Sequence, residues 1–349
     1  MKDFFKKALK YTLTGIVLLI CISQAAPKIP GAATAVFYIS AHAAMNKAEI
    51  TDADKKDNSA LQTEERANET DFKDNETSSQ QSDSSESAAS SELIPDENGV
   101  VTKQLNASSA NTSFDDIYIN NKINYPLDIN EILSLSDGAA INDPTKPQIL
   151  IVHTHTTESY SPLGEARTTD TDKNVVRVGR EMCDVLNSMG INTLHDETLH
   201  DSPSYTGSYS RAAKTIQSYL EKYPSIGFVI DVHRDSIGGG NSPRVKPTVE
   251  IDGKPAAQIM FVTGCETGEV TDYPNWKYNL QTALKFQRRI EQDHNGLTRS
   301  VYFTDCRYNM NLTKGSVLME FGSDANTLDE AVYSAHLAAE SIARVLLSS

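Results

Sequence analysis

Ionisable side chains follow three apolar runs of the sequence, at positions that suit chemistry better than packing. They are His153, His155 and Glu158 after the run 149–152, His233 after the run 226–232, and Glu320 after the run 316–319. Zinc takes imidazole and carboxylate ligands, and a catalytic zinc site keeps its fourth position for water. A further carboxylate can move the proton of that water to a leaving amine. The pattern predicts amide hydrolysis with His155, Glu158 and His233 as zinc ligands and Glu320 as the catalytic base and acid.

Residues beside these candidates are expected to support the site. Alternation along a strand directs His153 to the same side as His155, so His153 is either the metal ligand in place of His155 or a residue that supports a ligand. Asp231 and Asp235 flank His233. A metal-bound histidine usually donates its other ring N–H to a carboxylate or a carbonyl, so either aspartate could orient His233.

Other polar and aromatic residues are candidates for contact with a substrate. Arg234 could bind a substrate carboxylate or form a salt bridge with Asp235 or another neighbour. Asn309 and Asn311 could bind a peptide or cap a turn. Trp276, the single tryptophan, is expected in the core rather than stacked on a sugar ring. Two further pairs are expected in polar loops rather than lining a cleft: His195-Asp196 and His200-Asp201.

The chain is predicted to fold as an α/β domain because short apolar runs alternate with amphipathic segments. Strands are predicted at 148–152, 191–194, 226–232, 248–251, 257–263 and 316–320, and helices at 175–189, 210–223, 275–293 and 328–347. We expect a three-layer, hydrolase-like domain with a mostly parallel central sheet of five or six strands and helices on both faces. The ionisable side chains should converge outside the carboxyl ends of its parallel strands.

The N-terminal third of the chain differs in composition from the rest. In residues 1–45, four Lys precede the apolar run 11–26, which predicts a single-pass membrane anchor with an extracytoplasmic remainder. The run is short for a spanning helix, so a cleaved signal peptide and a secreted protein are the alternative. Residues 46–113 are rich in Ser and acidic side chains and are expected to form a disordered tether. The catalytic domain is expected to span residues 114–349.

Charge and cysteine content argue against two other kinds of site. The net charge of −15 opposes binding to nucleic acid, because that affinity depends on Lys and Arg neutralising phosphates. The four cysteines include no C-x-x-C pair, so the sequence indicates neither a disulfide framework nor a thiolate zinc site. Imidazole ligands favour zinc over magnesium.

A set of motifs between about Pro147 and the C-terminus resembles the stage II sporulation protein P family. The motifs are ILIVHTHTTESY at 149–160, DVHRD at 231–235, WxxN at 276–279, YNxNL at 308–312 and LMEFGSDxN at 318–326. The resemblance implies a peptidoglycan hydrolase similar to zinc-dependent N-acetylmuramoyl-L-alanine amidases that also cuts cross-linked peptide stems. It further implies a role in remodelling septal wall during engulfment of the forespore, alongside stage II sporulation proteins D and M.

One departure from the related amidases concerns the metal carboxylate. Those amidases often supply it from the start of the helix after the first strand, where this chain has Asp170 and Asp172 but no Glu. Glu158 replaces it in our assignment, by analogy with the His-x-x-Glu arrangement of zinc carboxypeptidases. A cell-wall zinc carboxypeptidase or endopeptidase is therefore an alternative function, and a catalytically inactive wall-binding scaffold is another.

Overall fold

The computed structural model describes residues 95–136, 138–160 and 165–348. All of them belong to one compact unit of the chain, Glu65–Ser349. The predicted membrane segment 1–45 and residues 46–94 of the predicted tether lie outside the described residues. Within the described part, no helix combines the length and the apolar character that crossing a membrane requires.

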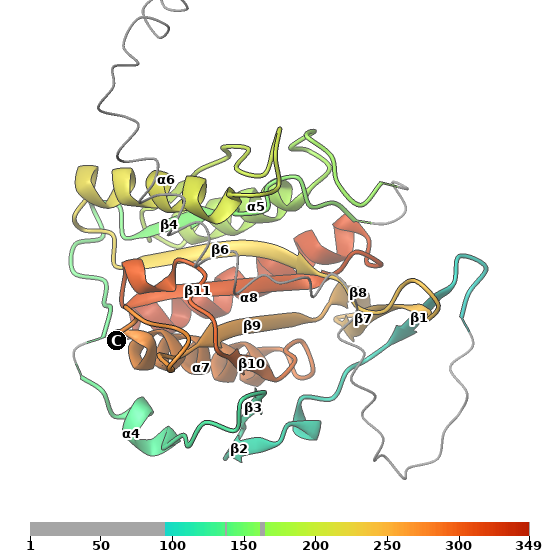
Figure 1. The fold of residues 1–349 in the computed structure, drawn as a ribbon, viewed down its shortest axis with the longest axis horizontal. Coiled ribbons are helices and arrows are strands. Elements are labelled where there is room, and N and C mark those ends of the chain that lie inside the picture. Colours follow the sequence, from blue (N-terminus) through green and yellow to red (C-terminus); the bar gives the residue numbers. More distant parts are fainter. Residues whose placement is uncertain (1–94, 137, 161–164, 349) are drawn as a thin grey trace, which may run out of the picture. The chain divides into compact units, whose positions relative to one another are not determined.

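A mixed β-sheet forms the centre of the described residues (Figure 1), with its strands in the order β2-β3-β10-β9-β11-β6-β4-β5. Their bounds are β2 Thr112–Phe114, β3 Ile117–Asn121, β4 Ile149–Val152, β5 Thr193–His195, β6 Phe228–Asp235, β9 Ile259–Gly264, β10 Val301–Thr304 and β11 Gly315–Ser323. Strands β11, β6, β4 and β5 run parallel to one another. Strand β9 is antiparallel to β11, β10 and β3 run parallel to β9, and β2 is antiparallel to β3.

The sheet is larger and less parallel than predicted. An α/β domain is confirmed, and the parallel half from β11 to β5 follows the prediction, but β9, β10 and β3 run in the opposite direction. The sequence does not predict β2 and β3, because these short strands contain only Ile117 and Ile119 as fully buried aliphatic residues. The predicted strand 257–263 is divided between β8, which ends at Ala257, and β9, which begins at Ile259.

Helices cover both faces of this sheet, as predicted. They are α5 (Val175–Ser188), α6 (Ser208–Lys222), α7 (Trp276–Asp293) and α8 (Leu328–Leu347), with the short helices α4 (Ile129–Leu133), η1 (Ala107–Ser109) and η2 (Met310–Leu312) in connecting segments. Alternation along β4 separates two apolar clusters. Ile149 and Ile151 pack in the cluster that contains α5, α7 and α8, whereas Leu150 and Val152 pack with Ile216 of α6. The continuous apolar run of β4 is therefore buried on both faces.

A separate three-stranded sheet has the order β1-β7-β8, with bounds β1 Val100–Lys103, β7 Arg244–Ile251 and β8 Lys254–Ala257. Strand β1 pairs in parallel with β7. Just after β1, the backbone N–H of Leu105 donates to the Gln258 side chain at 2.6 Å. Residues 100–105 lie in the range that composition assigns to the tether, yet they are hydrogen-bonded to the domain.

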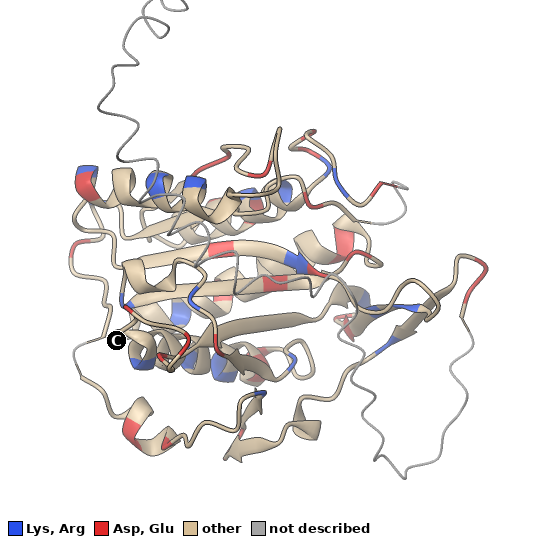
Figure 2. Cartoon of the chain, in the orientation of Figure 1, with Lys and Arg blue, Asp and Glu red and all other residues tan. Residues whose placement is uncertain are grey.

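Charged residues of both signs are spread over the described helices and loops (Figure 2). Some of them join neighbouring elements. Arg344 of α8 pairs with Asp293 at the end of α7 at 2.7 Å, and Ser341 donates to the same carboxylate at 2.8 Å. Ion pairs of this partly exposed kind contribute little individually, so the apolar contacts of α7 and α8 account for most of their packing.

Candidate active site

Strand register brings the predicted residues to one edge of the sheet. In the parallel pair β4 and β6, Val152 lies beside Asp231, so the turn that follows β4 passes close to His233. On the other side of β6, Glu320 of β11 is the direct register partner of His233. Directly opposed residues in neighbouring strands project to the same face of a sheet. The turn therefore supplies His155 and Glu158, and the strands supply His233 and Glu320.

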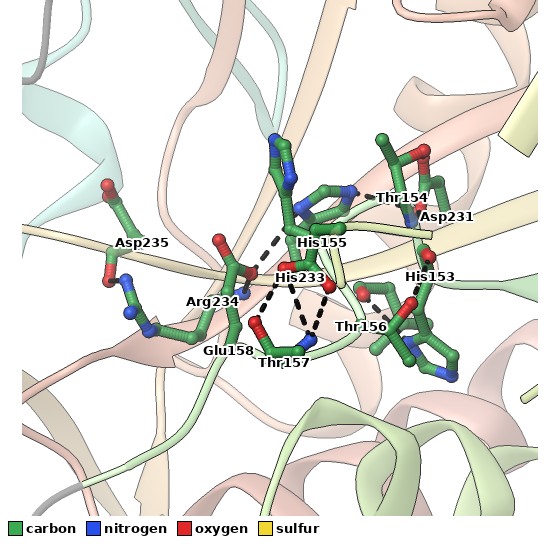
Figure 3. Close-up of polar contacts among 12 residues, drawn as sticks. His153, Thr154, His155, Thr156, Thr157, Glu158, Asp231, His233, Arg234 and Asp235 are labelled. Atoms are coloured by element: carbon green, nitrogen blue, oxygen red, sulfur yellow. Dashed lines mark hydrogen bonds and ion pairs between the residues drawn. The ribbon is translucent and has the colours of Figure 1, made fainter. Parts of the chain in front are cut away.

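His233 lies between two carboxylates (Figure 3). Its Nδ1 is 3.4 Å from Glu158 Oε2, and its Nε2 is 2.9 Å from Asp231 Oδ1. The second contact has the distance of an ion pair without the alignment of a hydrogen bond. Asp231 is itself fixed by Thr154, whose backbone N–H and hydroxyl donate to it at 2.8 and 2.6 Å. Of the two aspartates predicted to orient His233, the structure places Asp231 against the ring.

These contacts determine the protonation of the buried pair. Burial disfavours the charged imidazolium, but Asp231 and Glu158 outweigh it and raise the pKa of His233 well above its usual range. Burial likewise disfavours the ionised Glu158, but His233 and Arg234 outweigh it and lower the pKa of that carboxyl. His233 and Glu158 therefore form a buried ion pair.

His155 meets the same group from the side of α6. The ring centres of His155 and His233 are 5.3 Å apart, and their planes are nearly perpendicular at 87°. The Nδ1 of His155 is 3.4 Å from the hydroxyl of Ser208, the first residue of α6, and its Nε2 is 3.1 Å from Tyr205 Oη. Burial lowers the pKa of His155 to about 3. Its imidazole is therefore neutral near pH 7, which is the form that binds metals.

Glu320 has the properties of a proton-transfer group. Its Oε2 is buried and has no hydrogen-bond partner among the described residues. Burial is the main cause that raises the pKa of Glu320 to about 8, while the nearby His233 opposes the rise. A carboxyl whose pKa lies near the working pH can both accept and release a proton in a catalytic cycle. The Glu320 side chain therefore suits the predicted role of base and acid.

His153 points away from this group (Figure 3). Its Nδ1 is 2.9 Å from a backbone carbonyl of β6, and its Nε2 is 2.8 Å from Nε2 of His195. The ring packs on α5, where a Cβ added to Gly179 would lie 2.6 Å from two of its atoms. The prediction that His153 and His155 share one side is wrong, because β4 ends at Val152 and the chain then turns.

Arg234 and Asp235 have partners outside the group. The buried Arg234 guanidinium donates to the carbonyls of Ser159 and Ala166 at 3.1 and 2.9 Å. Its backbone N–H donates to Glu158 Oε2 at 3.1 Å. Asp235 instead accepts from Arg299 at 2.7 Å. The Arg234 side chain therefore fixes the segment that carries Glu158, and the Asp235 carboxylate pairs with Arg299 and not with Arg234.

Two neighbouring residues, His200 and Asp201, fix the turn after β4 from the opposite side. Asp201 accepts from the backbone N–H and hydroxyl of Thr157 at 3.1 and 2.7 Å and pairs with Arg167 at 2.8 Å. His200 Nδ1 is 2.8 Å from a carbonyl of the turn, and its Nε2 is 2.9 Å from the Thr215 hydroxyl. The expectation that this pair lies in a solvated loop is wrong, because the buried polar groups of the turn need partners. In the sequence, only the adjacency of His200 and Asp201 indicated that this pair could fix the turn.

The two asparagines lie in or next to η2, and the tryptophan is the first residue of α7. Asn309, immediately before η2, donates to the carbonyl of Tyr209 at 2.9 Å, and the partly exposed Asn311 lies within η2. Trp276 is buried and packs on Tyr125, with 5.5 Å between ring centres. The core position expected for Trp276 is confirmed.

Asp170 and Asp172, the alternative metal carboxylates, form ion pairs near the start of α5. Asp170 is 2.7 Å from Lys173, and Asp172 is 2.7 Å from Arg180. Both aspartates are largely exposed. Of Asp170, Asp172 and Glu158, Glu158 is therefore the one that the structure brings to His233.

A zinc ion needs ligands of the kinds found around His233. Among the described residues, no three His, Cys, Asp or Glu side chains are already arranged to hold an ion. However, two imidazoles on one tetrahedral ion, with Zn–N of about 2.0–2.1 Å, have ring centres roughly 5 Å apart, close to the 5.3 Å between His155 and His233. Glu158 lies beside the second ring. The donor types and the imidazole spacing fit zinc.

The family of this chain is indicated by comparison with known sequences. A family model described as Stage II sporulation protein P matches residues 27–343. A curated relative, Stage II sporulation protein P of Bacillus subtilis (strain 168), is 30% identical over 227 residues, which cover 59% of this chain and 54% of the relative. The chain thus matches about half the length of that relative.

Several solved structures show a weaker likeness. The CwlD amidase from Clostridioides difficile, solved in complex with the GerS lipoprotein, is 14% identical with a TM-score of 0.35 and covers 58% of this chain and 97% of its own. The N-acetylmuramoyl-L-alanine amidase AmiC2 of Nostoc punctiforme is 14% identical with a TM-score of 0.33 and covers 58% and 96%. At these identities and scores, the likeness does not establish the activity of this chain.

Proposed function

Because the chain belongs to the stage II sporulation protein P family, we propose that it is a zinc-dependent peptidoglycan hydrolase. The bond to be cut is the amide between the lactyl group of muramic acid and L-alanine, as in N-acetylmuramoyl-L-alanine amidases. Peptide bonds of cross-linked stems are proposed as further targets. The biological setting is remodelling of the septal wall during engulfment in sporulation.

One observation carries the proposal: two neutral or ion-paired histidines and two carboxylates meet at one sheet edge. His155, Glu158 and His233 would hold zinc, and His233 would give up one ring proton on binding. When bound, zinc supplies Lewis-acid polarisation of the amide carbonyl and lowers the pKa of water. Two of the four side chains have a buried atom that lacks a hydrogen-bond partner among the described residues, Glu320 Oε2 and His233 Nε2, and of these two only Glu320 has no ligand role.

Glu320 performs the proton transfers in this proposal. Its carboxylate form takes a proton from the attacking water, and the carboxylic acid so formed delivers that proton to the departing nitrogen. A pKa raised to about 8 by burial makes the second transfer favourable near neutral pH. The strand register that places Glu320 beside His233 keeps the carboxyl at the reacting centre.

The supporting residues hold the ligands in place. Asp231 faces Nε2 of His233 at 2.9 Å, which leaves Nδ1, the atom nearer to Glu158, for the ion. This carboxylate–histidine arrangement fixes the ring and increases its basicity. Arg234 and Asp201 fix the two sides of the turn that carries His155 and Glu158. We therefore expect changes at these positions to weaken zinc binding without removing a ligand.

Product analysis separates this activity from its alternatives. Full-length protein is incubated with isolated cell wall, with zinc or with a chelator, and the products are identified by mass spectrometry. Free lactyl ends that form only with zinc support the amidase. New peptide termini alone would mean a carboxypeptidase or endopeptidase, and wall binding without products would mean a scaffold.

Location and partners remain part of the proposal. Residues 1–45 would anchor the chain in the membrane, or be removed as a signal peptide, with the catalytic residues outside the cytoplasm. Stage II sporulation proteins D and M are proposed partners. Co-purification from sporulating cells, with and without residues 1–45, tests both points, because an anchored assembly requires that segment.

A further inference from the structure

Tyr205 covers the His155 side of the site and was not predicted from the sequence. Its ring stacks on the His155 imidazole with 4.4 Å between centres and 9° between planes. Its hydroxyl oxygen is 3.1 Å from His155 Nε2. Tyr205 is nevertheless 43% exposed, which is unusual for a large apolar side chain in the described residues. A substrate that approaches His155 therefore meets Tyr205.

The stacked geometry decides where the hydroxyl lies. Tyr205 Oη is hydrogen-bonded to His155 Nε2, and because the two planes are nearly parallel it reaches that nitrogen from the face of the imidazole, not in the plane of the ring. The lone pair of an imidazole nitrogen lies in the ring plane. Tyr205 therefore leaves the in-plane direction of Nε2 open.

Two further contacts hold this arrangement. Ser208 Oγ is 3.4 Å from His155 Nδ1. A proton on Nδ1 directed to Ser208 leaves the lone pair on Nε2, the nitrogen beside Tyr205. The Arg167 guanidinium lies 4.6 Å from the centre of the Tyr205 ring, and Asp201 holds that guanidinium at 2.8 Å. Cation–π contact of this kind restrains an exposed aromatic ring.

We propose that Tyr205 is a further catalytic residue, whose hydroxyl donates a hydrogen bond to the carbonyl oxygen of the scissile amide. The inference rests on the proposed function. As water attacks the amide carbon, that oxygen gains negative charge, and a donor fixed beforehand at its position lowers the barrier. No proton is transferred from Tyr205 in this step. The hydroxyl is suited to the role because it lies next to the His155 nitrogen without blocking it.

The test compares full-length Tyr205→Phe with the unchanged protein. The substitution keeps the stacked ring and removes only the hydroxyl. We expect zinc content and zinc affinity within about twofold of the unchanged protein, KM on a soluble muropeptide within about twofold, and kcat lower by on the order of 10- to 100-fold. Affinity for acetohydroxamate, whose oxygens bind zinc and carry negative charge, should fall by on the order of tenfold by calorimetry. Tyr223→Phe, at the other end of α6, is the matched control and should behave as the unchanged protein.

Three outcomes would overturn the inference in different ways. Unchanged kcat and unchanged hydroxamate affinity in Tyr205→Phe would mean that the ring only packs on His155. If a change in zinc affinity accounted for the whole change in kcat, Tyr205 would control how the ion binds and would not donate to the substrate. If the unchanged protein itself neither bound zinc nor cut muropeptide, the proposed function would fail together with this inference, whereas a defect confined to the variant supports the inference.

Discussion

Beside the turn that follows β4, one face of the sheet holds a histidine with partners for both ring nitrogens, and the other face holds a charged histidine. On the α5 face, His153 has partners for both ring nitrogens, a backbone carbonyl and His195. On the α6 face, His233 is charged between two carboxylates, and Glu320 beside it has a buried oxygen without a partner among the described residues. Buried polar groups are normally paired. The contrast separates a histidine that stabilises the fold from a group that is available for chemistry.

This difference arises from side-chain alternation followed by a turn. His153 continues the direction of Ile149 and Ile151, towards α5. The chain turns immediately afterwards, so His155 meets α6 and His233 instead. Two residues of sequence thus separate a structural histidine from a candidate ligand. Substitutions on each face provide direct ways to test the distinction.

The largest effect is expected from His233→Ala compared with His195→Ala. The first removes a proposed ligand, so zinc content measured by elemental analysis and wall hydrolysis should both fall to background. The second removes a partner of His153 on the α5 face, so zinc and activity should be kept while the melting temperature falls. Loss of zinc from His195→Ala with normal zinc in His233→Ala would reverse the assignment of the two faces.

Glu320→Gln should separate chemistry from metal binding. Gln keeps the shape of the side chain and cannot accept the proton of water, so kcat should fall by about 10²–10⁴-fold with zinc content unchanged. Glu158→Gln is the matched change on the ligand side and should lose zinc. If Glu320→Gln lost zinc and Glu158→Gln kept it, the roles of the two carboxylates would have to be exchanged.

Gly179→Ala tests how tightly the α5 face is packed. Changing a Gly inside a helix to Ala normally stabilises the protein. Here, however, the added Cβ would lie 2.6 Å from the buried His153 ring. The ring would have to move and weaken its hydrogen bonds, so we expect a loss of about 2–4 kcal/mol in the free energy of unfolding. Urea denaturation measures it. An increase in stability would show that His153 is free to move.

A smaller, pH-dependent effect is expected from Glu320 in the presence of a chelator. Burial raises the pKa of Glu320 to about 8 in the folded protein, above the usual value of about 4.3 in the unfolded chain. The folded state therefore holds more protons between these values, and stability falls as pH rises towards 8. Between pH 5.5 and 8.5, the free energy of unfolding of the unchanged protein should fall by on the order of 3 kcal/mol or less relative to that of Glu320→Gln. Parallel stability curves for the two proteins would contradict the raised pKa.

Much of the domain could be predicted because its central elements have strong local patterns. The runs around β4, β6 and β11 are continuously apolar, and α5 to α8 follow helical periodicity with clear ends. The reversed direction of β9 could not be predicted, because an apolar strand has the same composition in either direction. Strands β2 and β3 are too short for periodicity to identify, and β3 depends on pairing with the distant β10.

The site could be predicted only where residue type and strand end coincide. His155, Glu158, His233 and Glu320 meet that condition, and the family suggested by the motifs is confirmed. Their roles as ligands and base remain predictions. Arg234, Asp201 and Tyr205 could not be assigned from the sequence, because their contacts depend on how β6, the turn after β4 and the segment between β5 and α6 pack against one another.

The hydrogen bonds of the turn have a consequence for amide hydrogen exchange. The backbone N–H groups of Thr154, Thr157 and Arg234 donate to the carboxylates of Asp231, Asp201 and Glu158. Two of these amides lie in a segment without regular secondary structure, where exchange is usually fast. Here each carboxylate also holds a second side chain of the site, so the amides can exchange only when those contacts open as well. They should exchange as slowly as amides of the strands and open together, so their rates would report the integrity of the site without any substrate.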